Sequence, residues 1–134
     1  MADFWNRGVL DIAVAASSDR HALLRNHVGQ ARRWLGVELV GGRSNRDGVG
    51  ARVIAKIGGR QQMRELVLGD GYGSQNSLRQ YFGLGEATEV DELIVRWPRS
   101  GITQTFRRVP SNRIVVITEG IDTLAVRPTG ASAT

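Results

Sequence analysis

The sequence contains no cysteine, which excludes disulfide bonds, thiol nucleophiles and cysteine-ligated zinc. It also has no apolar run near the ~20 residues that a membrane-spanning helix needs. Its first residues, MADFWNRG, lack the apolar core of a signal peptide, so we expect no signal peptide within these residues. These absences leave a globular domain that is held together by its apolar core.

Aromatic residues are scarce, at 6% of the chain, and the basic charge is scattered. The formal net charge is +5, and the arginines that carry it are spread along the whole sequence. Single-stranded nucleic acid is usually bound where cations and aromatic rings alternate on one surface. Nucleic-acid binding is therefore the weakest of the functions we consider, and a solvated basic surface is the better interpretation.

No segment repeats its apolar residues at helical spacing over three turns. Instead, 17 glycines punctuate the 134 residues, and most of them separate short apolar runs. This pattern is typical of a turn-rich β protein. We predict an all-β fold, namely an antiparallel β-sandwich, with a partly open β-barrel as the alternative.

The strands are predicted where apolar residues alternate or form short runs. The run from Val9 to Ala16 suits a buried strand, and Gly58-Gly59 joins two alternating runs into a β-hairpin. Trp97 is expected to pack against the sandwich, and Arg96 to pair with Glu92 on the same strand. The predicted strands cover residues 9–16, 21–26, 34–41, 50–57, 60–69, about 81–82, 90–98, 102–109, 112–120 and 122–126.

The stretch SNRDGVGARVIAKIGG, residues 44–59, could be a phosphate loop, a metal loop or a turn. A phosphate loop is followed by a helix, but the residues after GVG alternate like a strand. A calcium loop needs more carboxylates than the single Asp47, which also has Arg46 beside it. We therefore interpret Asn45 to Gly48 as a turn in which Gly48 supplies a positive φ.

The sequence offers no catalytic constellation. His21 and His27 have no spacing that joins them to a nucleophile, and Asp91 and Glu92 point to opposite faces of a strand. We therefore predict no catalytic residue and no cofactor.

A long, ordered, glycine-rich loop is expected at about residues 69–80. Loops on a rigid β scaffold often carry binding residues, and tyrosine with amide and hydroxyl groups suits a sugar or a peptide. The candidate binding residues are Asp70, Tyr72, Ser74, Gln75 and Asn76.

Four motifs together resemble the ASPIC/UnbV domain: WLGVELVGGRSNRDGVGARV, GDGYGSQNS, YFGLGEATEVDELIVRWPRSG and NRIVVITEG. They follow in the expected order from about Trp34 to Gly120. That domain typically lies at the C-terminus of secreted proteins resembling cartilage acidic protein, often after FG-GAP β-propeller repeats. It also occurs in bacterial proteins, including one from enediyne gene clusters. The family usually has histidine before FGLG, where this chain has Tyr81.

The resemblance implies an extracellular or periplasmic domain, and no catalytic activity is generally assigned to the family. We therefore expect a non-catalytic binding module for a protein or a glycan partner, with unknown oligomeric state. An enzyme or accessory protein of secondary metabolism is the alternative.

The first residues resemble the end of an FG-GAP repeat, whose calcium loop reads D-x-D-x-D-G-x-x-D. Asp3, Gly8 and Asp11 match, but Trp5 and Arg7 stand where two further acidic ligands belong, so we predict no calcium binding. We expect a repeat remnant at residues 1–28, the β domain at 29–127 and a flexible tail at 128–134. Residues 9–26 are expected either to join the sandwich or to cross to another copy.

Overall fold

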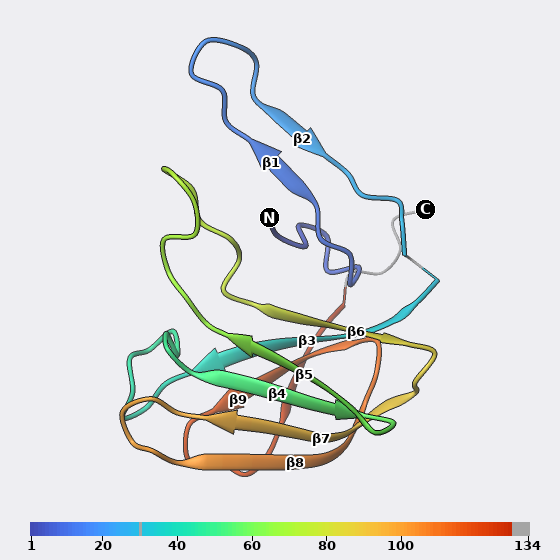
Figure 1. Ribbon diagram of the computed structural model, residues 1–134, viewed down its shortest axis with the longest axis vertical. Helices are drawn as coiled ribbons and strands as arrows, with labels where there is room; N and C mark the ends of the chain where they lie inside the picture. The colour runs from blue at the N-terminus through green and yellow to red at the C-terminus, as the bar shows by residue number, and fades with distance from the viewer. Residues whose placement is uncertain (30, 130–134) are drawn as a thin grey trace.

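The computed structural model describes residues 1–29 and 31–129, and in these residues it is all β (Figure 1). Within those residues, no helix has the length and apolar character of a membrane span. The predicted tail lies outside the described residues from residue 130 onward. The ten strands are β1 (Ile12–Val14), β2 (Ala22–Leu24), β3 (Arg33–Val40), β4 (Arg52–Ile57), β5 (Arg60–Glu65), β6 (Gln80–Gly85), β7 (Glu89–Arg96), β8 (Thr103–Pro110), β9 (Arg113–Thr118) and β10 (Ala125–Arg127).

Eight of these strands form two four-stranded sheets, which confirms the predicted sandwich. Sheet 1 has the order β10-β9-β3-β6, and sheet 2 has the order β5-β4-β7-β8. The sheets are not joined by strand pairing into a barrel. The hairpin predicted at Gly58-Gly59 joins β4 to β5, with Ile57 opposite Arg60. The expected loop connects β5 to β6, which begins at Gln80.

One pair of strands departs from the predicted antiparallel arrangement. β3 and β9 run parallel, from Leu35 opposite Arg113 to Val40 opposite Thr118. Strands joined by a tight turn must be antiparallel, but distant strands are free of that constraint. Since five strands separate β3 from β9 along the chain, the local pattern contains no information about their relative direction.

The core lies between the two sheets and is formed mainly by alternate residues of β3, β4, β6, β7, β8 and β9. Phe82, Leu35 and Leu93 are fully buried there. Trp97 is also buried, as predicted, and its indole N–H donates to Oε1 of Gln104 at 2.6 Å. The indole therefore contributes apolar packing while its only polar atom remains hydrogen-bonded.

The predicted pairing of Arg96 with Glu92 is wrong. Glu92 pairs with Lys56 at 2.8 Å and with Arg107 at 2.9 Å, which face it from the two neighbouring strands. Directly opposed residues on adjacent strands lie about 5 Å apart, whereas residues four positions apart along one strand, such as Glu92 and Arg96, lie about 13 Å apart. The ion pairs of this sheet therefore run across the strands.

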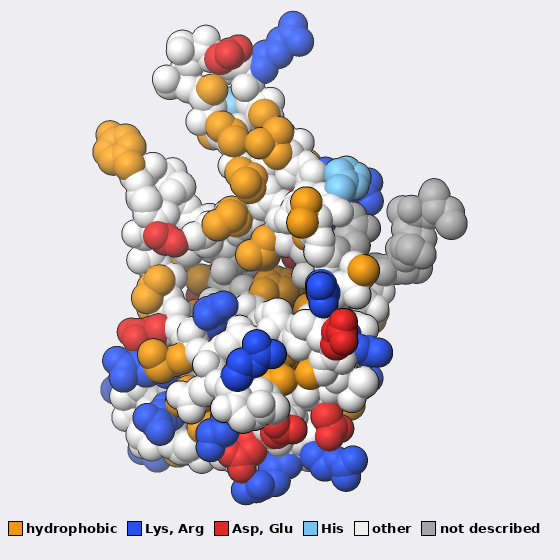
Figure 2. Space-filling model, turned by 45° about the vertical axis from the view of Figure 1, so that its right-hand side comes forward, with side chains coloured by type: hydrophobic (Ala, Val, Ile, Leu, Met, Phe, Trp, Pro, Cys, Tyr) orange, Lys and Arg blue, Asp and Glu red, His pale blue; other side chains and the backbone are white. Residues whose placement is uncertain are grey.

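β1 and β2 form a separate two-stranded hairpin, which projects from the sandwich (Figure 1). The prediction of a buried strand at residues 9–16 is wrong, because β1 is exposed throughout. The hairpin also does not join either sheet of the sandwich, so that alternative fails. Its apolar side chains include Ile12, Leu23 and Leu24, which are exposed. Figure 2 shows hydrophobic side chains gathered on the part of the molecule that projects from the sandwich. An apolar run is buried only where a second layer covers it.

The segment before the hairpin packs on the outer face of sheet 1. Gly8 lies directly on the ring of Trp34, since a Cβ built on Gly8 would come within 2.0 Å of that ring. The hydroxyl of Tyr81 on β6 donates to Asp3 at 3.0 Å. Arg79 donates to the side chain of Asn6 at 2.6 Å. These contacts anchor the root of the hairpin to the sandwich.

Candidate functional site

The turn predicted at Asn45 to Gly48 is confirmed. The Gly48 N–H donates to the Asn45 carbonyl at 2.9 Å, and Gly48 has a φ of 69°. The side-chain amide of Asn45 also bonds both the N–H and the carbonyl of Val49, each at 2.8 Å. The stretch is therefore a turn that leads towards β4.

Glu119, which follows β9, holds the neighbouring loop in place. Its carboxylate accepts hydrogen bonds from the Gly42 N–H at 2.8 Å, the Ser44 N–H at 2.7 Å and the Ser44 hydroxyl at 2.8 Å, and one from the Ser100 hydroxyl. Desolvation by itself would raise the pKa of Glu119, but the hydrogen bonds from Ser100, Ser44 and Gly42 lower it to about 2. This carboxylate is therefore a structural anchor, and it is ionised at neutral pH.

The two aspartates of the calcium-like loop are buried and bonded to protein donors. Asp3 accepts from the N–H groups of Arg7 and Gly8 at 2.9 and 2.6 Å. Asp11 accepts from the Arg7 guanidinium at 2.8 Å and from the Asn26 N–H at 2.8 Å. Within the described residues, no group of three or more His, Asp or Glu side chains is placed to hold a metal ion. The positive charge beside Asp11 thus comes from the Arg7 guanidinium, whereas in a calcium loop it would come from the ion.

Four of the five predicted binding residues bond within the loop between β5 and β6. The Asp70 carbonyl accepts from the Ser74 hydroxyl at 2.7 Å, and its carboxylate accepts from the Asn76 amide. The Gln75 side chain accepts from the Gly69 N–H at 2.7 Å. The fifth residue, Tyr72, extends fully exposed from the loop. The structure thus brings four residues together and leaves the tyrosine side chain available to a ligand.

A cleft of about 480 Å³ separates this loop from the root of the hairpin. One wall is apolar and includes Phe4, while the other is polar and carries Gln75. The Ser77 N–H donates to the Met1 carbonyl at 2.9 Å, so the two walls are bonded to each other at the base. The apolar wall consists of Met1, Ala2, Phe4 and Ala13, and the polar wall of Ser74, Gln75, Asn76 and Ser77.

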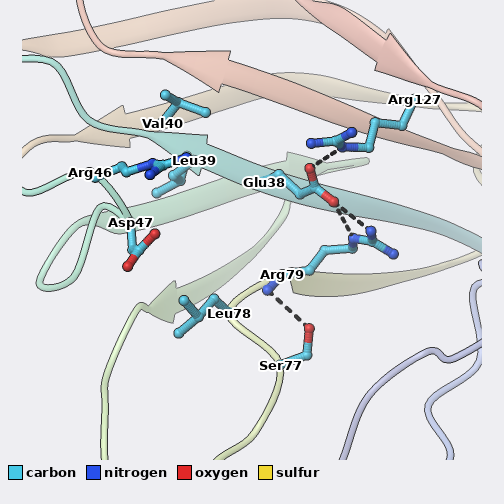
Figure 3. A pocket seen from close by; sticks show the side chains of 9 residues that line it. All are labelled: Glu38, Leu39, Val40, Arg46, Asp47, Ser77, Leu78, Arg79 and Arg127. Carbon is cyan, nitrogen blue, oxygen red and sulfur yellow. Dashed lines mark hydrogen bonds and ion pairs between the residues drawn. The ribbon is translucent and has the colours of Figure 1, made fainter.

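Two further hollows share lining residues with this cleft. One of about 270 Å³ lies against β5 and β6 and includes Asp70 and Asn76. The other, of about 380 Å³, lies on the outer face of sheet 1 and is shown in Figure 3. Ser77 lines all three, and Arg79 lines the second and third. The hollows therefore share their lining residues along the stretch that enters β6.

The third hollow, which we call the sheet-1 groove, contains charged residues that our sequence analysis did not identify. Glu38 on β3 accepts hydrogen bonds from Arg79 at 2.8 Å and from Arg127 on β10 (Figure 3). The one sequence feature that pointed to these charged residues is Glu38 itself, a glutamate inside the apolar run WLGVELVG. Its partners are far away in the sequence, since Arg79 lies 41 residues from Glu38, so no local pattern could reveal them.

In the sheet-1 groove the single carboxylate of Glu38 faces two guanidinium groups, those of Arg79 and Arg127. Desolvation raises the pKa of Glu38, but the hydrogen bonds and positive charges of Arg127 and Arg79 outweigh it and lower the pKa overall. Burial raises the pKa of Tyr81, and the nearby Asp3 carboxylate adds to that effect, against the lowering by Arg79. At neutral pH Glu38 is thus ionised and Tyr81 is protonated, so neither group is poised to exchange a proton.

Comparison with known proteins supports the resemblance stated above. A search of curated proteins found no match. The family model described as ASPIC and UnbV matches residues 41–124, which is more than half of the chain. The matched region includes the Asn45–Gly48 turn, the loop with the predicted binding residues, and Glu119. The chain therefore belongs to the ASPIC and UnbV family.

Proposed function

We propose that this protein is a non-catalytic, extracellular binding module, and that its ligand, a glycan or a protein, occupies the cleft between the hairpin and the loop that enters β6. The observation that carries this proposal is the pairing of an apolar wall with a polar wall, with Tyr72 free at the end of the polar loop. Ligand sites are typically concave and combine apolar surface with a few positioned polar groups. The cleft has this composition.

The rigidity of the polar wall supports the same proposal. Hydrogen bonds from the Ser74 hydroxyl and to the Gln75 side chain fix the loop against itself. A loop that is ordered before binding loses less conformational entropy when a ligand is bound. Tyr72 can then contribute contact area at little entropic cost, because its side chain has only two rotatable bonds.

The lowered pKa values of two acidic groups favour a binding function over a catalytic one. A general acid or base works best when its pKa lies near the operating pH. The pKa values of Glu38 and Glu119 are instead lowered by the groups that bond to them. Both carboxylates serve to hold neighbouring segments in position.

The test is binding to a glycan array and to immobilised candidate proteins, with Tyr72→Ala and a matched surface control, Met63→Ala. Tyr72 makes no hydrogen bond within the described residues, so its removal should leave the fold unchanged. Met63 is exposed on sheet 2, away from the cleft. Because Tyr72 extends from the loop tip beyond the residues that line the cleft, we expect Tyr72→Ala to weaken ligand binding and Met63→Ala to retain it. Equal binding by both variants would contradict the proposal.

A further inference from the structure

The sheet-1 groove contains an arginine, Arg127, that one ion pair holds in place and that has most of its hydrogen-bonding capacity unused within the described residues. Arg79 already uses four of its five N–H donors, which bond Glu38, Asn6 and Tyr81. Arg127 bonds Glu38 only through its Nε, and its side chain is 57% exposed. Within the residues that the structure describes, the two terminal nitrogens of Arg127 form no hydrogen bond, while the bond to Glu38 fixes the direction of the guanidinium. This is the geometry that binds a carboxylate through two parallel hydrogen bonds.

The opposite end of the groove carries a donor and an acceptor. Arg46 and Asp47 lie there in the turn that precedes β4, and both are exposed (Figure 3). Neither takes part in an ion pair with any residue that the structure describes. Leu39, Val40 and Leu78 line the groove along with these charged ends. A ligand that fills the groove thus meets a free guanidinium at one end and mixed polar groups at the other.

We propose that the sheet-1 groove binds a sugar ring that carries a carboxylate, as in the uronic acid units of an acidic glycan. The carboxylate accepts two hydrogen bonds from the terminal nitrogens of Arg127. The ring hydroxyls, each both a donor and an acceptor, donate to Asp47 and accept from Arg46. This inference rests on the proposed binding function, and it adds to that function the chemical class of the ligand and a second subsite.

An acidic peptide fits the groove less well than an acidic sugar does. The carboxylate of either ligand meets the same repulsion from Glu38 and Asp47, but an aspartate or glutamate side chain carries no hydroxyl donor beside its carboxylate for the oxygens of Asp47. A uronic acid ring carries hydroxyl donors close to its carboxylate, and these can satisfy the free oxygens of Asp47. The mixture of free donors and free acceptors therefore selects the sugar.

The shared lining of the three hollows extends this binding surface along a glycan chain. Ser77 lies between the sheet-1 groove and the cleft beside the hairpin, because it lines both. Neighbouring sugar units of one chain can therefore occupy both hollows at once. We expect longer oligosaccharides to bind more tightly than single units, because later contacts form at high effective concentration.

The test is calorimetric titration of the full chain with oligogalacturonate, with its neutral methyl ester and with polyglutamate. The Arg127→Gln variant should weaken oligogalacturonate binding at least about tenfold, since it removes charged hydrogen bonds to the carboxylate. The control is Arg107→Gln, which removes an exposed arginine that pairs with a glutamate on the distant sheet 2. We expect this control to bind within about twofold of the unaltered protein. If Arg127→Gln does not fold, Arg127→Lys preserves the charge beside Glu38 but still removes the paired donors.

Three results would overturn the inference: no binding of oligogalacturonate, equal weakening by both variants, or equally tight binding of the methyl ester or of polyglutamate. None of these results bears on ligands that depend on Tyr72. Failure of the uronic acid subsite is therefore distinguishable from failure of the proposed binding function, which the Tyr72→Ala variant tests independently.

Discussion

The sandwich and the N-terminal hairpin use similar residues with opposite outcomes. β3 and β4 bury Leu35, Val37, Leu39, Val53 and Ile57 between two sheets, whereas β1 and β2 leave their apolar side chains exposed. An isolated two-stranded hairpin is at best marginally stable in water, while stacked sheets of four strands are stable. Apolar composition therefore marks a strand, but only a second layer of structure turns that strand into core.

The largest expected effect on stability comes from a test that removes one apolar side chain from each region. Phe82 is fully buried between the sheets, and Leu24 is half exposed on the hairpin. Phe82→Ala should lower the free energy of unfolding by about 3–5 kcal/mol, because it leaves a cavity in the core. Leu24→Ala should lower it by less than about 1 kcal/mol. Urea unfolding measures both, and similar losses would show that the hairpin is part of the same core.

A second test concerns the polar anchor of the sandwich, Glu119. Its folded pKa of about 2 lies below the value of about 4.3 expected in the unfolded chain. Ionised Glu119 therefore stabilises the fold above about pH 4.3, and this stability is lost as the pH falls towards 2. Glu119→Gln should be less stable at neutral pH and should lose less stability on acidification.

Chemical unfolding at several pH values between 2 and 7 measures this difference. Some pH dependence should remain in the variant, because Lys56 and Arg107 lower the pKa of Glu92, and the pKa of Glu38 is also lowered. Parallel pH profiles for the variant and the unaltered protein would show that Glu119 is not an anchor.

A third test weakens the junction between the two regions. Gly8 has a φ of 80°, and a Cβ there would clash with the ring of Trp34. Gly8→Ala should therefore lift the N-terminal segment from sheet 1, expose Trp34 and shift its fluorescence to longer wavelength. Gly29→Ala is a matched control, since Gly29 has a φ of 81° but, among the described residues, no neighbouring atom within 4 Å of the added Cβ. Equal fluorescence of the two variants would contradict the packing of Gly8 on Trp34.

The smallest expected effect is that of calcium on the N-terminal segment. Arg7 already places a positive charge against Asp11, and Asp3 is bonded to backbone N–H groups. A cation would have to displace these donors, so calcium should leave the melting temperature unchanged. Calorimetric titration checks this directly, and a site of micromolar affinity would refute the prediction.

Local features of the fold could be predicted from the sequence. The Gly58-Gly59 hairpin and the Asn45–Gly48 turn depend on neighbouring residues, so their patterns were sufficient. The parallel pairing of β3 with β9 was not predictable, because it depends on the order of distant strands. The exposure of β1 was also missed, because a short apolar run is compatible with both burial and exposure.

In the candidate site too, local features could be predicted from the sequence, whereas contacts between distant residues could not. The polar loop of Asp70 to Asn76 was recognised from composition, since its glycines and amides lie in one continuous stretch. The sheet-1 groove was missed, because Glu38, Arg79 and Arg127 meet only after the sheet has formed. Glu119 and Ser44 are likewise 75 residues apart. Contacts between residues so far apart in the sequence can be identified only when the fold is known.

Amide hydrogen exchange of the full chain tests most directly the claim that a rigid sandwich presents a weakly held hairpin. The amides of β1 and β2 should exchange through local opening at a small fraction of the global unfolding free energy, while those of β3, β4, β7 and β9 should exchange only through global unfolding. Equal protection of the hairpin and the sandwich would contradict this account.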